Sequence, residues 1–178
     1  MKKAPPRPQF RNGPPPDPGK RFWPVVTPKQ NATLRVILLD NQWQSVPTHW
    51  DGRTIPCSQS SDCAACWSGR KVRWVAFTSV AMLTGGRAVL QVTGTCCRKL
   101  QKEFESEGVC RGYIVSLTRR GKTNNSPIEF SVQSRTDLKS DLPDPFSVKE
   151  TVENLWGYQP HLPFSETQEP TLGGNAHA

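Results

Sequence analysis

Alternating apolar and polar positions predict β-strands through the middle of the chain. In residues 128–133, Ile128, Phe130 and Val132 alternate with polar residues, which places three apolar side chains on one face of a strand. Four further segments are rich in β-branched and apolar residues and are bounded by turn residues. These segments are residues 33–40, 71–80, 87–93 and 112–118.

One segment, residues 95–108, has helical spacing instead. Its apolar residues recur three and four positions apart, which places them on one face of a helix, and a glycine supplies the stop. The residues concerned are Cys96, Cys97, Leu100, Phe104 and the final Gly108. We interpret the two cysteines as core thiols rather than reactive groups.

The order of these elements is β-β-β-α-β-β, which predicts an all-β domain with one helix. This is the connectivity of the OB-fold, a five-stranded barrel with a helix between its third and fourth strands. We place that domain at residues 31–136. Such barrels bind single strands on the face of the second and third strands, between the first–second and fourth–fifth loops.

The two ends of the chain differ from the middle in composition. Residues 1–30 combine many prolines with seven Lys or Arg and one acidic residue, and residues 137–178 have seven acidic residues and two Lys. Such segments lack the apolar residues needed for a core, so we predict disordered N- and C-terminal tails. Within the acidic tail, Ser147 and Glu150 form a capping-box pattern that favours a short helix.

The overall charge favours a polyanionic partner. The formal net charge is +8 and the pI is about 9.4, which points first to nucleic acid. A basic arm and body with an acidic C-terminal segment is a recurring plan of single-strand-binding proteins, where the acidic segment recruits protein partners. The alternative is that both ends are simply solvated.

Four potential metal ligands fall within eighteen residues, in the loop between the first two predicted strands. They are His49, Cys57, Cys63 and Cys66, with the spacing H-x7-C-x5-C-x2-C. A Cys-x2-Cys pair with an upstream Cys and His can surround a zinc ion as a tetrahedron. Four protein ligands leave no position for a reactive water, so we predict structural zinc.

A catalytic zinc site is the alternative to this structural role. Zinc deaminases use H-x-E followed by P-C-x-x-C, but here Asp51 stands in place of the glutamate and Pro56 precedes the wrong cysteine. We find no other catalytic set and predict that the protein is not an enzyme. The start of the chain lacks an apolar signal segment, and no apolar run is long enough for a membrane span. We therefore expect a cytoplasmic protein that is not secreted. This location is compatible with association with the nucleoid, and with a protein encoded by a phage or a mobile element.

Aromatic and basic residues interleave around the metal loop and in the polar turn near residue 120. Aromatic rings stack on unpaired bases and basic groups follow the phosphates, so the pattern predicts a nucleic-acid-binding surface. The alternative for each aromatic is core packing; Trp74 and Phe77 lie three apart on one strand, so one of the two is a core residue. The predicted contacts are Trp43, Trp50, Arg53, Trp67, Arg70, Lys71, Arg73, Trp74, Phe77, Arg87, Arg119, Arg120 and Lys122.

A His, a Cys and a Cys-x2-Cys pair in one segment of an OB barrel resemble the zinc-containing single-stranded DNA-binding proteins of T4-type bacteriophages. The resemblance covers the four ligands and the basic-to-acidic plan of the chain. It implies binding of single-stranded DNA with little sequence specificity and protein partners at the acidic C-terminal region. Two alternatives stay open: an RNA-binding OB module, and a zinc-dependent adaptor in replication, recombination, transposition or transcription.

Overall fold

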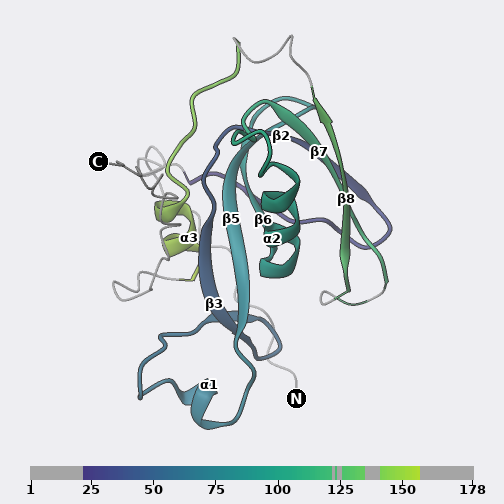
Figure 1. Cartoon of the computed structure of the whole chain (residues 1–178). Helices are drawn as coiled ribbons and strands as arrows, with labels where there is room; N and C mark the ends of the chain where they lie inside the picture. Colours follow the sequence, from purple (N-terminus) through teal and green to yellow (C-terminus); the bar gives the residue numbers. More distant parts are fainter. Residues whose placement is uncertain (1–21, 122, 124–125, 135–140, 157–178) are drawn as a thin grey trace, which may run out of the picture.

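The computed structural model contains eight strands in one mixed sheet and three helices within its described part (Figure 1). The structure describes residues 22–121, 123, 126–134 and 141–156. The strands are β1 (Val25–Val26), β2 (Thr33–Leu38), β3 (Gln44–Trp50), β4 (Thr54–Pro56), β5 (Arg73–Met82), β6 (Arg87–Thr93), β7 (Tyr113–Arg119) and β8 (Ile128–Ser134). The helices are α1 (Ala64–Trp67), α2 (Gly94–Glu103) and α3 (Lys149–Leu155). The prediction of a mostly β protein is confirmed.

The five predicted strands all form, as β2, β5, β6, β7 and β8. They lie side by side in the order β6-β5-β2-β7-β8, and each neighbouring pair is antiparallel. Two additions were not predicted: β1 pairs in parallel with the edge of β6, and β3 pairs with β5 and β4. Among the described residues no ladder joins β6 to β8, so the sheet is open and the closed barrel is not confirmed.

Both faces of the central strands are covered, because successive side chains of a strand point to opposite faces. On the inner face, the strand residues Val36, Leu38, Ala76, Val80, Leu90, Val115 and Leu117 pack together with α2. On the outer face, Ile37, Phe77, Ala81, Val89 and Ile114 pack against segments from the two ends of the chain. The alternation predicted for β8 is confirmed, since Ile128, Phe130 and Val132 all pack into the inner core.

Helix α2 closes the inner core, as its spacing predicted. Cys96, Cys97, Leu100 and Phe104 are buried, and the Phe104 ring lies 5.0 Å from the ring of Tyr113. The helix begins after Thr93, whose side-chain oxygen accepts a hydrogen bond of 3.2 Å from the backbone N–H of Cys96. This cap satisfies one of the free N–H groups of the first turn.

Replacing the capping residue is expected to lower stability modestly. The substitution Thr93→Ala removes the oxygen that caps α2, so the free energy of unfolding should fall by about 1 kcal/mol. Urea denaturation followed by circular dichroism measures the change. Thr95→Ala, at an exposed position of the same turn, is the control and should have little effect. An equal loss in both variants would mean that the cap does not stabilise the helix.

The described parts of the two tails are ordered, which corrects the prediction of disorder for residues 22–30 and 141–156. Their aromatic residues cover the outer face of the sheet: the rings of Trp23 and Phe146 lie 4.7 Å apart, and Trp156 meets Phe77 edge-on at 5.6 Å. Helix α3 buries Val152 in the same cluster. These apolar side chains lie in otherwise polar segments and become buried against the outer face of the sheet. The composition of the end segments alone does not indicate this packing.

Two arginines hold these end segments through backbone carbonyls. Arg111 donates to the carbonyl oxygens of Leu142 and Pro143, at 3.2 and 3.1 Å. Arg119 donates from Nε to the carbonyl oxygen of Pro28 at 2.9 Å. The short helix expected in the acidic tail is confirmed as α3, but its predicted capping box is not, because α3 begins after Val148 without a side-chain cap.

Candidate functional site

The segment between β2 and β5, predicted as a loop, is a small lobe built on a β-hairpin (Figure 1). The hairpin pairs β3 with β4, so that His49 lies opposite Ile55 and Thr48 opposite Pro56. Cys57 follows β4 directly, and its N–H donates to the carbonyl oxygen of Pro47 at 2.8 Å. The hairpin register therefore places His49 and Cys57 near each other.

The other two predicted ligands come from the start of α1. Cys63 is the N-cap residue of this helix and Cys66 lies within its single turn. The N–H of Trp67 donates to the carbonyl oxygen of Cys63 at 3.0 Å, which closes the turn. A Cys-x2-Cys spacing in such a turn places both sulfur atoms on the same side.

The structure brings the four predicted ligands together. Cys57 Sγ lies 3.8 Å from Cys63 Sγ and 3.5 Å from Cys66 Sγ. His49 Nε2 lies 3.5 Å from Cys63 Sγ and 3.3 Å from Cys66 Sγ, and all four ligand atoms are within 4.8 Å of one another. Tetrahedral ligands at zinc, with Zn–S about 2.3 Å and Zn–N about 2.0–2.1 Å, are about 3.6–3.8 Å apart. The group has the size of a zinc site.

Electrostatics also favour a cation at this point. The backbone N–H of Cys66 lowers the pKa of the Cys63 thiol to about 6, whereas the Cys57 thiol raises the pKa of Cys66 to about 12. The N–H group stabilises the Cys63 thiolate, whereas a second thiolate at Cys66 would be repelled by its neighbours at such short distances. Metal binding requires the deprotonated thiols, and the positive charge of a divalent cation would offset the repulsion between them. His49 and Cys57 are buried, so the cation would be largely shielded from solvent.

The donor set determines what the cluster can do. Three thiolates and one imidazole suit zinc, and a zinc ion with four protein ligands has no open position for a reacting molecule. Among the described residues, Nδ1 of His49 is buried without a hydrogen-bond partner. Metal-bound histidines usually donate this second nitrogen to an acceptor, so the atom is available to a water or ligand.

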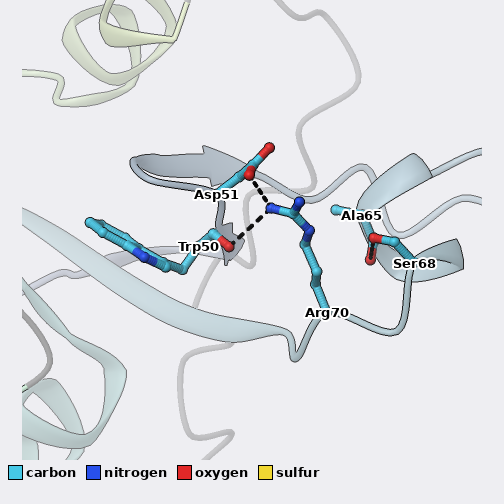
Figure 2. Close-up of polar contacts among 5 residues, drawn as sticks. All are labelled: Trp50, Asp51, Ala65, Ser68 and Arg70. Carbon is cyan, nitrogen blue, oxygen red and sulfur yellow. Dashed lines mark hydrogen bonds and ion pairs between the residues drawn. The ribbon is translucent and has the colours of Figure 1, made fainter.

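Arg70 connects the two halves of the lobe (Figure 2). Its guanidinium donates to the backbone carbonyl of Trp50 at 3.3 Å and forms an ion pair with Asp51. At the end of α1, the hydroxyl of the C-cap residue Ser68 donates to the carbonyl oxygen of Ala65 at 3.0 Å. The predicted nucleic-acid contact Arg70 and the catalytic alternative Asp51 are therefore paired with each other across the lobe.

The predicted aromatic contacts divide into exposed and buried residues. Trp50, Trp67 and Trp74 keep 43%, 78% and 41% of their surface exposed. Trp43 and Phe77, at 3% and 0%, are core residues, which corrects their prediction as stacking partners. Phe77 lies under Trp156 on the outer face, so the prediction that one of Trp74 and Phe77 belongs to the core is confirmed.

The predicted basic contacts divide in the same way. Arg53, Lys71 and Arg73 are exposed on or beside the metal lobe. Arg119 is buried and holds Pro28, so it cannot present its guanidinium as a solvated phosphate contact. Two others are placed apart from this group: Arg87 lies over the Trp23 ring at 5.7 Å, and Arg120 pairs with Glu129 at 2.8 Å. The remaining predicted contact, Lys122, lies outside the described residues.

A groove of about 880 Å³ runs from the metal lobe to the start of α2. One side is formed by β3, β4 and the start of β5, with Trp50, Arg73 and Trp74. The other side is formed by the end of β6, the first turns of α2 and the residues that begin β8. The buried His49 also lines this groove. The metal cluster thus lies beside one wall of this groove.

Sequence reasoning missed the contribution of α2 to this groove. Arg98 and Lys99 line it and are exposed, yet the helix was interpreted only as a core element. The available signal was the polar face of the same helix, where two adjacent cations lie in the first turns. That these two cations face the metal lobe depends on tertiary contacts, and the local sequence pattern does not predict it.

Comparison of this chain with protein-family models, curated proteins and solved structures finds no match. In the part of the chain that the structure describes, no helix has the length and apolar character needed to cross a bilayer. The case for a function therefore rests on the groove and on the metal cluster beside it.

Proposed function

We propose that this protein binds single-stranded nucleic acid, DNA in preference to RNA, in the groove beside a structural zinc site. The observation that carries the proposal is the combination of two half-exposed indoles, Trp50 and Trp74, with exposed cations in one groove. Indole faces stack on unpaired bases of any identity, and cations neutralise the phosphates. Binding by these means has little sequence specificity.

The arrangement of the strands supports this proposal. The five long strands and α2 follow the chain order and antiparallel neighbours of an OB-type domain, and we propose that the domain is of this kind. Its first–second connection, which contributes to ligand binding in OB-folds, corresponds to the metal lobe here. Helix α3 and Trp156 cover the outer face at Phe77, which leaves the groove on the other side for the ligand.

The zinc ion would act by fixing the lobe. Helix α1 has four residues and buries none of them, so packing contributes little to its position. A metal held by His49, Cys57, Cys63 and Cys66 would connect this helix to the hairpin that carries Trp50. The indole would then be held in place before the nucleic acid arrives, which lowers the entropy cost of binding.

The direct test is a fluorescence-anisotropy titration of a labelled single strand of about 30 nucleotides, longer than the site of one OB domain. We expect tight binding to single-stranded DNA, weaker binding to matched RNA and duplex, quenching of tryptophan fluorescence, and affinity that falls steeply with salt. Equal affinity for duplex, or no binding, would exclude the proposal. Tighter binding to RNA would replace DNA with RNA as the ligand.

A second candidate is a protein-interaction adaptor, which the position of Trp67 favours. This indole is 78% exposed on α1 and does not line the groove. Exposed aromatic residues are enriched at the centres of protein interfaces. Trp67→Ala distinguishes the two functions: loss of a protein partner with unchanged affinity for single strands would assign Trp67 to an adaptor surface.

A further inference from the structure

The first turns of α2 present two cations to the groove. Arg98 and Lys99 are exposed, whereas Cys96, Cys97 and Leu100 of the same turns are buried in the core. The buried residues fix the rotation of the helix about its axis, so that its polar face lines the groove. Neither cation forms an ion pair with a described residue, and both are free to meet a ligand.

The start of α2 lies directly against Trp74, one of the exposed tryptophans. A Cβ atom at Gly94 would lie 2.7 Å from Cβ of Trp74 and 3.1 Å from its carbonyl oxygen. A glycine at this position thus allows the backbone of the helix to approach β5 this closely. As a result, Trp74 and the first turn of α2 lie next to each other in the groove.

The groove has a single sign of charge among the described residues. Arg73, Arg98, Lys99 and the buried Arg119 line it, and no aspartate or glutamate among those residues does. Burial raises the pKa of the nearby Cys96 thiol to about 11, whereas the positive charges of Lys99 and Arg119 act to lower that pKa. The Cys96 thiol therefore lies within the positive potential of these two cations. The positive end of the α2 dipole adds to the same potential.

A second feature of the groove also points to a ligand. The His49 ring lines it, is buried, and has an Nδ1 atom without a hydrogen-bond partner among the described residues. Buried polar atoms of this kind are commonly satisfied by an ordered water or a bound molecule. This observation is independent of the charges on α2.

We infer that Arg98 and Lys99 bind the phosphodiester backbone of a single strand whose bases stack on Trp50 and Trp74. This inference rests on the proposed function and adds to it the side of the groove on which the phosphates lie. The cations of α2 form the phosphate wall, and the indoles of β3 and β5 form the base wall. A duplex, whose bases are already stacked in pairs, cannot use the indoles in this way.

The experiment compares two charge-matched double variants of the full chain loaded with zinc. Arg98→Gln with Lys99→Gln removes the proposed wall; Arg35→Gln with Lys102→Gln removes two exposed cations that do not line the groove. Affinity for a labelled single strand is measured by anisotropy at several salt concentrations. The α2 variant should bind about 10- to 30-fold more weakly at 0.1 M salt, with a log–log salt slope smaller by about 1.4, since each phosphate contact contributes about 0.7.

The outcomes separate this inference from the proposed function. If the unaltered protein does not bind single strands, the proposed function itself is wrong. If it binds and the two variants weaken binding equally, net charge alone acts and the phosphate wall is wrong. The exchange variant Arg98→Lys with Lys99→Arg keeps both charges and should retain most of the affinity. Zinc content and melting temperature, which these exposed positions should not alter, verify that each variant is folded.

Discussion

The substitution Cys57→Ser is expected to abolish stable zinc binding and to release α1 from the β3–β4 hairpin of the metal lobe. A serine hydroxyl is a poor zinc ligand. Loss of a group that only supports a ligand weakens metal binding by up to about 100-fold, so loss of a direct ligand should weaken it by more than that. Because α1 buries no residue, packing contributes little to holding this helix beside the hairpin. The inner core around α2 excludes the metal ligands and should remain folded.

Two measurements check this result. Metal analysis after gel filtration should fall from one zinc per chain to almost none, and limited proteolysis should cut first within residues 51–72. Cys97→Ala is the matched control, because it removes a buried thiol that lies outside the ligand cluster. Retention of zinc by Cys57→Ser would mean that Cys57 is not a ligand. Chelation of the unaltered protein should reproduce the cleavage and lower the affinity for single strands.

The double substitution Trp50→Ala with Trp74→Ala should produce the largest loss of affinity for single strands. Each base–indole stack contributes about 1–3 kcal/mol, so the loss of two stacks should weaken binding by at least about 30-fold. The salt slope should change little, because the phosphate contacts are still present. Anisotropy titration measures the affinity, and the remaining tryptophans should no longer report strong quenching.

Trp67→Ala is the matched control for this prediction. Trp67 is the most exposed of the three tryptophans of the lobe and β5, but it does not line the groove. We expect its removal to change the affinity for single strands by less than about 3-fold, within the range of a residue without a stacked base. A larger loss for Trp67→Ala than for the double variant would place the base-stacking surface on α1 instead of in the groove.

Local patterns in the sequence predicted the elements that local physics determines. The alternation of Ile128, Phe130 and Val132 predicted which face of β8 enters the core. The spacing of Cys96, Cys97, Leu100 and Phe104 predicted the buried face of α2. His49, Cys57, Cys63 and Cys66 were identified because ligand chemistry constrains both residue type and spacing, and the structure brings them together.

The errors concern residues whose environment comes from distant parts of the chain. Phe77 and Trp43 carry the same aromatic signal as Trp50 and Trp74, but the first is covered by α3 and the second is enclosed in the inner core. Arg119 carries the same charge as Arg73, but it donates to Pro28, which is 91 positions away in sequence. The hairpin of β3 and β4 was taken for a loop because its residues lack the apolar alternation of the long strands.

The sequence by itself determined the five long strands, the helix α2, the basic character of the chain and the identity of the four clustered ligands. These features follow from the periodicity of side chains along the backbone and from the donor atoms that metals accept. Only the tertiary structure decided which aromatics stay exposed, that the end segments cover the outer face, and that α2 faces the metal lobe across one groove. The physical reason is that exposure depends on which distant surfaces pack together, and no local pattern contains that information.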